Sequence, residues 1–384
     1  MSKESAPVMA GVSSTRYVML DSLTILRGPA ALFVFFYHTR WAHVVPSASV
    51  GYVGVALFFV LSGFVLTWSY KPADGAKKFY LRRFARVYPL HLFFFALALA
   101  ILVLTQEAPS AGATLSNLVL LHTWVPNWDY IFSVNGVSWS LGCEAFFYAC
   151  TPLVLGWLSH RSPKAGYTVL AGWFLLTAAV ASAIALTSNY ADVVVYANPL
   201  LRSGEFALGM LLGLLALKVR DGDLAMPRIR TWQLCAVTAL ALAGISGVSK
   251  VSLPQTINGF VLDPVWFLLI GMFALHDILG MLALHDIQRA QSHHQVGAPV
   301  PGNWIRRSLV YFGEVSFAFY LVHEIVIFRF IKTSLGSDMI RMDARGILMM
   351  LIILVISILA AIIAHHAIER PARIMILKAS TRTL

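Results

Sequence analysis

Apolar residues along this chain form long blocks that alternate with short polar connections. Ten of these blocks are about 20 residues long, the length that a helix needs to cross the hydrocarbon core of a bilayer. We therefore predict an all-α polytopic membrane protein, a bundle of about ten transmembrane helices. The predicted spans are 21–42, 51–69, 87–105, 134–157, 166–187, 197–217, 231–249, 259–281, 308–330 and 345–367.

The Lys and Arg residues in the connections indicate the orientation of the bundle. When connections are numbered alternately from the N-terminal tail, one set holds 21 of the 29 basic residues and the other set holds five. Positive residues stay on the cytoplasmic side, so we predict that both termini are cytoplasmic. The long outer connection 106–133 has no Lys or Arg but contains Trp124, Trp128 and Tyr130, as expected of an interfacial aromatic belt.

Composition excludes a soluble protein of this size. Hydrophobic residues make up 58% of the 384 positions and charged residues only 12%, whereas about a quarter is charged in soluble domains. A net charge of +11 would raise nucleic acid as a partner of a soluble protein. Here the charge follows topology, so we expect membrane lipids and no nucleic acid. We predict one transmembrane domain over 1–384, cytoplasmic tails at 1–19 and 372–384 and no soluble accessory domain; oligomer formation is left open.

Arg27 and His38 need an explanation first, because charged groups inside an apolar span are costly. They are eleven positions apart, which is about 20° past three helical turns and roughly 16 Å along the axis. Both side chains therefore share one helix face, which we expect to line a protein interior or a wet cavity. Burial favours the neutral imidazole that a general base needs, so His38 is the leading catalytic candidate; the alternative is a histidine satisfied by a neighbouring helix. For Arg27, anion binding and an ion pair with Glu144, Glu205 or Glu314 are both open.

A basic run opens the third predicted span from the cytoplasmic side. It contains Arg82, Arg83 and Arg86, followed by Tyr88. A helix start favours anions, so one interpretation is a docking site for a phosphate-rich ligand. The other is a topology signal with lipid headgroup contacts, which the run taken alone favours.

Polar residues also gather at the outer entrance of the fourth predicted span. Asn135, Ser138 and Trp139 can donate hydrogen bonds, and Glu144 follows inside the membrane. An intramembrane carboxylate is a functional candidate by default. The alternative is helix capping and anchoring in the aromatic belt, which suits Asn135 better than Glu144.

Two further patterns lie inside predicted spans. Tyr320 and His323 continue a stripe from Ser316 that either lines the cavity or joins helices by hydrogen bonds. Arg202 and Glu205 are three positions apart, close enough for a structural ion pair.

No metal site or disulfide framework is expected. The three cysteines are odd in number and lie in apolar segments. The histidine pairs at 293–294 and 365–366 lack acidic or cysteine partners at ligand spacing.

Taken together, these residues resemble the acyltransferase-3 family of integral membrane acyltransferases. The opening segment, Leu20-Asp-Ser-Leu-Thr, looks most like actinobacterial members, including macrolide O-acyltransferases. The matching pieces run in order along the chain: Arg27 with His38, Arg82-Arg-x-x-Arg86, Ser138-Trp-Ser-Leu-x-x-Glu144, Arg202-x-x-Glu205, Tyr320-Leu-Val-His323 and Glu369-Arg-Pro371.

The resemblance implies a bacterial plasma-membrane enzyme that moves an acyl group from cytoplasmic acyl-CoA, acetyl-CoA or a longer thioester, to a hydroxyl. The expected catalytic residues are His38 and Glu144. The expected acyl-CoA-binding residues are Arg27, Arg82, Arg83, Arg86 and Tyr88. The expected acceptor-side residues are Asn135, Ser138, Trp139, Tyr320 and His323, and the first three are also candidates for holding the oxyanion.

The acceptor is the least determined part of this interpretation. A small natural product such as a macrolide or its sugar is expected first, and a cell-surface or cell-wall polysaccharide is the alternative. A transporter or flippase that forms no bond is a rival class, because intramembrane Arg, Glu and His suit a transport path equally well.

Overall fold

The computed structural model describes residues 20–39, 50–187, 191–251, 254–291, 304–334 and 344–381. All regular secondary structure in these ranges is helical. The α-helices are α1 (Asp21–His38), α2 (Val53–Ser69), α3 (Gly75–Leu104), α4 (Ala111–Leu118), α5 (Trp128–Ile131), α6 (Trp139–Leu158), α7 (Pro163–Thr187), α8 (Ala191–Tyr196), α9 (Pro199–Arg220), α10 (Thr231–Val248), α11 (Gln255–Gln291), α12 (Trp304–Ser334), α13 (Ala344–Ala364) and α14 (Arg370–Thr381). Short turns are η3 (Pro72–Asp74), η4 (His122–Trp124), η5 (Gly136–Ser138) and the π-helical η6 (His365–Glu369).

Each predicted span coincides with a helix, which confirms the all-α polytopic fold. Among the described residues, eight helices are long and apolar enough to cross a membrane: α3, α6, α7, α9, α10, α11, α12 and α13 with its continuation. The other two predicted spans are α1, which carries Arg27 and His38, and α2, an apolar helix of 17 residues. The protein is thus an integral, multi-pass membrane protein, and the cytoplasmic placement of its termini stays a prediction.

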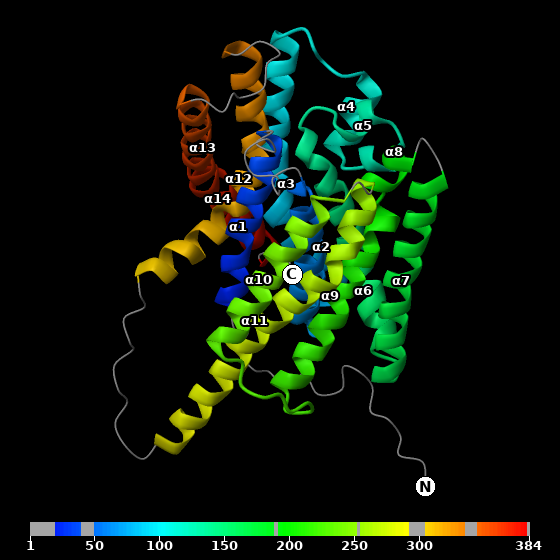
Figure 1. Cartoon of the computed structure of the whole chain (residues 1–384), viewed down its shortest axis with the longest axis vertical. Coiled ribbons are helices and arrows are strands. Elements are labelled where there is room, and N and C mark those ends of the chain that lie inside the picture. Colours follow the sequence, from blue (N-terminus) through cyan, green and yellow to red (C-terminus); the bar gives the residue numbers. More distant parts are fainter. Residues whose placement is uncertain are drawn as a thin grey trace.

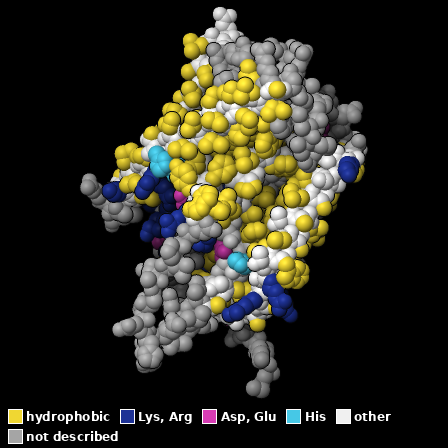
Figure 2. Space-filling view, turned by 60° about the vertical axis from the view of Figure 1, so that its left-hand side comes forward, with side chains coloured by type: hydrophobic (Ala, Val, Ile, Leu, Met, Phe, Trp, Pro, Cys, Tyr) yellow, Lys and Arg dark blue, Asp and Glu magenta, His cyan; other side chains and the backbone are white. Residues whose placement is uncertain are grey.

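The short helices α4, α5 and α8 lie together at one end of the bundle (Figure 1). They belong to connections between long helices, and the first two fall in the predicted outer connection. Ser110 caps α4 by accepting a hydrogen bond from the Ala113 backbone N–H at 3.2 Å. A broad hydrophobic surface covers much of one side of the molecule, and Lys and Arg side chains gather beside and below it (Figure 2).

Small residues allow the long helices to pack closely, as is usual in membranes. One close crossing joins α2 and α9, where a Cβ on Gly209 would lie 1.9 Å from the Val60 carbonyl oxygen. A second close contact joins α1 and α12, where a Cβ on Gly313 would lie 1.9 Å from the Thr24 carbonyl oxygen. This second contact sets the distance between the two helices that carry the central histidines.

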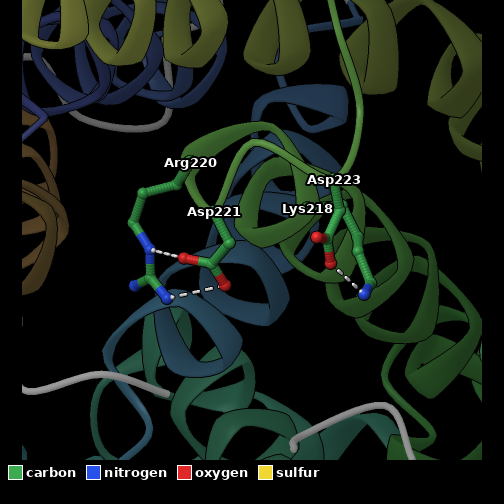
Figure 3. A network of polar contacts seen from close by, with 4 residues as sticks. All are labelled: Lys218, Arg220, Asp221 and Asp223. Carbon is green, nitrogen blue, oxygen red and sulfur yellow. Dashed lines mark hydrogen bonds and ion pairs between the residues drawn. The ribbon is translucent and has the colours of Figure 1, made fainter. Parts of the chain in front are cut away.

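Polar contacts fix the end of α9. Lys218 forms an ion pair with Asp223, and Arg220 donates hydrogen bonds of 2.8 and 3.2 Å to Asp221 (Figure 3). Gly222 follows with a φ of +81°, a left-handed conformation that glycine adopts readily. These contacts hold part of the basic connection between α9 and α10 in a defined turn.

Two predicted boundaries differ from the structure. The third span was expected from residue 87, but α3 begins at Gly75, so the basic run lies within the helix and not at its start. Because helix-end electrostatics fall off within the first turn, the helix start contributes little to anion binding at Arg82, Arg83 and Arg86. The segment expected as a C-terminal tail is also largely ordered, because α14 extends to Thr381 and packs against α3.

Candidate active site

The central feature of the site is a pair of histidines from α1 and α12. Nε2 of His323 lies 3.1 Å from Nδ1 of His38, with ring centroids 5.0 Å apart. His323 is fully buried, and its ring stacks on Phe319 of its own helix. His38 is half-buried at the last residue of α1. The structure therefore brings together two residues that the sequence analysis assigned to the same site.

Backbone carbonyls assign the tautomers of both rings, because a carbonyl oxygen can only accept a hydrogen bond. Nδ1 of His323 lies 3.2 Å from the Phe319 carbonyl oxygen, and Nδ1 of His38 lies 3.0 Å from that of Val34. Two neutral rings satisfy this pattern when each carries its proton on Nδ1. His38 then shares its N–H between Val34 and Nε2 of His323. The lone pair on Nε2 of His38 stays available to accept a proton.

Glu324 supplies a carboxylate next to this pair. It interacts electrostatically with His38, and its Oε2 is buried without a hydrogen-bond partner among the described residues. Gly136 makes room for it, because a Cβ there would lie 2.4 Å from Oε1 of Glu324. A carboxylate in this position stabilises the imidazolium that forms when His38 takes up a proton. Sequence reasoning missed Glu324, although an acidic residue directly after His323 in an apolar span was a usable signal.

A cavity of about 860 Å³ borders this group at the end of the bundle where α4 and α5 lie. Its lining includes Glu324 and Gly136 beside the histidines, Asn135, and aromatic residues of α5. The volume is within the range of small-molecule sites. The cavity gives a ligand from this end of the bundle a route to the carboxylate next to His38.

A second group of charges surrounds Arg27. Arg86 and Glu144 are its strongest charged neighbours, followed by Glu369. Arg83 and Arg373 belong to the same group through their interactions with Arg86. We call Arg27, Arg83, Arg86 and Arg373 the arginine cluster. With two carboxylates among four guanidinium groups, the cluster carries an excess of positive charge.

The contacts of Glu144 place it with the arginine cluster. Tyr148 donates a hydrogen bond to its carboxylate, and its basic neighbours are Arg27, Arg86 and Arg83. In the described part of the chain, Arg27 itself forms neither of the ion pairs considered with Glu144 and Glu205, and Glu314 is exposed. A catalytic role for Glu144 stays a prediction, since the carboxylate that interacts with His38 is that of Glu324.

Arg82 lies outside the arginine cluster, and Arg83 makes a further contact besides those within it. Arg82 forms an ion pair with Asp74, which also pairs with Lys78 at 3.0 Å. Arg83 lies over the ring of Phe79, with its guanidinium carbon 5.6 Å from the ring centroid.

Tyr88 lies apart from these charges. Its hydroxyl donates to the Leu118 carbonyl oxygen at 3.4 Å, and its ring stacks on Phe84. Leu118 ends α4, so this contact directs Tyr88 toward the connection that contains α4 and α5. The structure therefore does not bring Tyr88 together with the arginine cluster, and its donor-binding role stays a prediction.

The predicted acceptor-side residues are buried and hydrogen-bonded. Ser138 donates to the Asn135 carbonyl oxygen at 2.6 Å, and the Asn135 amide donates to the Leu321 carbonyl oxygen at 3.0 Å. The Tyr320 hydroxyl donates to the Val137 carbonyl oxygen at 3.2 Å. These bonds join η5 to α12. An oxyanion role for Ser138 would require its bond to Asn135 to break, whereas the Asn135 amide keeps a second N–H; both roles stay predictions.

Trp139 packs against the predicted Arg202–Glu205 pair, which the structure confirms at 3.0 Å. The Arg202 guanidinium lies between two rings, 5.9 Å from the Trp139 centroid and 5.3 Å from that of Phe59. This pair is structural, because it joins α9 to the aromatic core next to α2 and α6. The expectation of no metal stays a prediction; among the described residues, no three His, Cys, Asp or Glu side chains form a group that could hold one.

Comparison with known proteins identifies the class as membrane acyltransferases. Residues 20–366 match the family described as "Acyltransferase domain". The chain belongs to this family, as the resemblance predicted.

Individual relatives refine the comparison. The chain is 31% identical to acyltransferase MdmB of Streptomyces mycarofaciens, over 93% of this chain and 92% of that protein. It is 28% identical to the peptidoglycan O-acetyltransferase OatA of Listeria monocytogenes, over 43% of this chain and 29% of that protein. It is 26% identical to nodulation protein 10 of Rhizobium leguminosarum, over 44% of this chain and 53% of that protein. No solved structure matches the chain significantly.

Proposed function

We propose that this protein transfers an acyl group from acyl-CoA to a hydroxyl, with His38 as the general base. The observation that carries the proposal is the contact of His38 with His323, beside the carboxylate of Glu324, which interacts electrostatically with His38. His323 and the Val34 carbonyl hold the proton of His38 on Nδ1, which leaves Nε2 as the basic nitrogen. Glu324 stabilises the charge that develops and lines the cavity through which an acceptor arrives.

In the proposed reaction, Nε2 of His38 removes the proton from the acceptor hydroxyl while its oxygen attacks the thioester carbonyl carbon. The carbon–sulfur bond then breaks, and the coenzyme A thiolate takes the proton back from the imidazolium. No other reactant is needed. A positioned general base of this kind typically contributes about 10²–10⁴-fold to the rate.

The arginine cluster is the proposed donor site. Guanidinium groups recognise phosphates well, and coenzyme A carries several. Arg27 and Arg86 support this assignment because the described structure gives neither of them an ion pair, whereas Arg82 is already neutralised by Asp74. Arg373 of α14 joins the donor site although it was expected in a tail. The pantetheine arm would then extend along α1 from Arg27 toward His38.

The proposed acceptor is a small hydroxylated natural product, such as a macrolide or its sugar. The resemblance of the opening segment to macrolide O-acyltransferases supports this choice, and the peptidoglycan O-acetyltransferase OatA matches less than half of the chain. The proposed location is a bacterial plasma membrane. The transport alternative lacks a specific feature in its favour, whereas the histidine pair next to a carboxylate suits proton transfer.

Purified protein incubated with acetyl-CoA and single acceptors tests this proposal. We expect free thiol release that depends on the acceptor, with an acylated product visible by mass spectrometry. His38→Ala should lower the rate about 10²–10⁴-fold without lowering the thermal stability. His160→Ala is the matched control, because His160 is exposed in the turn after α6. Full activity of the His38 variant would remove this residue from the chemistry, and thiol release without dependence on any acceptor would count against transfer.

A further inference from the structure

The charge of the cavity next to the histidine pair is opposite to that of the chain. Its lining includes three acidic residues, Glu107, Asp129 and Glu324, and no Lys, Arg or His among the residues that the structure describes there. The chain as a whole has a net charge of +11. Asp129 and Glu324 have no basic partner within ion-pair distance in the described part of the chain. Asp129 and Glu324 therefore give the cavity negative charge that no basic side chain among the described residues neutralises.

Aromatic rings form a wall of the same cavity. Trp128 and Phe132 are stacked with centroids 5.3 Å apart and an angle of 1° between the rings, and Tyr130 also lines the space. One face of Trp128 is covered by Phe132, but 40% of the residue stays exposed, so part of it is available to a ligand. Aromatic faces next to carboxylates are the usual surroundings of a bound organic cation.

Two buried polar atoms at the inner end of the cavity are acceptors without a partner among the described residues. Asn135 is 3% exposed, and its amide nitrogen is used by the Leu321 carbonyl oxygen. Its Oδ1 has no hydrogen-bond partner among the described residues, and neither has Oε2 of Glu324. A ligand that fills this end must therefore supply hydrogen-bond donors, as hydroxyl and ammonium groups do.

We propose that this cavity binds the acceptor as a hydroxylated organic cation, that is, an alcohol that also carries a protonated or quaternary amine. Asp129 and the rings of Trp128 and Tyr130 hold the cationic group at the mouth. Asn135 and Glu324 receive the hydroxyl end and direct it toward His38. The inference rests on the proposed acyl transfer, because it names the chemical class of the acceptor for that reaction.

A binding experiment without acyl-CoA tests the charge requirement alone. Choline and its neutral isostere 3,3-dimethylbutanol are titrated into the detergent-purified full chain and followed by saturation-transfer NMR. We expect saturable choline binding and at least about fivefold weaker binding of the neutral alcohol, as expected for a cation between rings and a carboxylate. Equal binding of the two probes, or saturable binding of neither, would overturn the inference.

Two substitutions with matched controls locate the binding. Asp129→Asn and Trp128→Leu should each weaken choline binding about threefold to tenfold. Asp223→Asn and Trp232→Leu, which change residues outside the cavity, should leave it unchanged. Thermal stability of each variant reports folding, and a folded Asp129→Asn protein with normal choline affinity would contradict the assignment.

A transfer experiment separates this inference from the proposed function. His38→Ala should bind choline normally, because binding requires no chemistry. If the wild-type protein binds choline in the cavity but releases no thiol from acetyl-CoA with any acceptor, the proposed acyl transfer is contradicted and the proposed cation site is supported. If the enzyme acylates neutral alcohols as efficiently as cationic ones of the same shape, the proposed acyl transfer is supported and the proposed cation site is contradicted.

Discussion

Nε2 of His323 lies 3.1 Å from Nδ1 of His38, although 285 positions separate the two residues in the chain. The contact determines which nitrogen of His38 carries the proton, because the Nδ1–H of His323 already donates to the Phe319 carbonyl oxygen. In the proposed reaction, His323 is therefore a positioning residue, which orients the base without touching the reacting atoms. Hydrogen-bond partners fix the tautomer of functional histidines in the same way in other proteins.

Substitution of His323 should separate the acceptor function of its Nε2 from the volume of its ring. His323→Leu fills the buried space but removes the acceptor, so kcat should fall about tenfold to hundredfold as the base loses its orientation. His323→Gln places a carbonyl oxygen near the position of Nε2 and should recover most of the loss. KM for acyl-CoA should change little in both variants, and steady-state kinetics with acetyl-CoA measure both quantities.

A purely structural role for His323 gives a different pattern. In that case the Leu and Gln variants would lose thermal stability and activity together, and Gln would not restore kcat. Melting curves in detergent, recorded beside the kinetics, distinguish the two outcomes.

The neighbouring arginines of α3 should contribute unequally to donor binding. Arg86 belongs to the arginine cluster and has no ion pair among the described residues, whereas Arg82 is neutralised by Asp74. Loss of one charged hydrogen bond to a phosphate costs about 1.5–3 kcal/mol, so Arg86→Gln should raise KM for acetyl-CoA about tenfold or more. Arg82→Gln should raise it less than about threefold, because exposed ion pairs contribute little.

The donor analogue acetyl-pantetheine provides the control for this prediction, because it lacks the nucleotide phosphates. Its KM should be high in the wild-type protein and should not rise further in Arg86→Gln. Equal effects of Arg82→Gln and Arg86→Gln on the KM for acetyl-CoA would show that Asp74 does not neutralise Arg82 in the working enzyme.

The sequence alone was sufficient to predict the long helices and to single out the two polar residues of α1, Arg27 and His38. Long apolar blocks have few stable conformations in a bilayer, so each predicted span became a helix. Arg27 and His38 were recognisable because charged groups are costly in such a block. Their helix positions follow from local geometry alone, which a sequence determines well.

The partners of these residues depend on contacts between distant helices, which no local pattern contains. The packing of α12 on α1 brings Glu324 into interaction with His38. Asp74 forms an ion pair with Arg82, and the donor-binding role of Arg82 stays a prediction. In the sequence, Arg373 was counted only among the basic residues that indicate topology. The packing of α14 on α3 brings it into interaction with Arg86. The sequence also did not predict that α3 begins before its apolar part, because the basic residues there are typical of a connection between spans.

Gly313 should be essential for the close approach of α1 and α12 that brings the histidines together. A Cβ at this position would lie 1.9 Å from the Thr24 carbonyl oxygen, which is backbone and cannot rotate away. Gly313→Ala must therefore push the helices apart, at a cost of about 1–3 kcal/mol in the free energy of unfolding. Because the same displacement lengthens the His38–His323 contact, kcat should fall together with the melting temperature.

Gly172→Ala is the matched control, since nothing lies within 4 Å of a Cβ there. This substitution should be neutral or slightly stabilising, because alanine favours the helix. A Gly313→Ala protein as stable and active as the Gly172→Ala protein would mean that this contact does not set the position of α12.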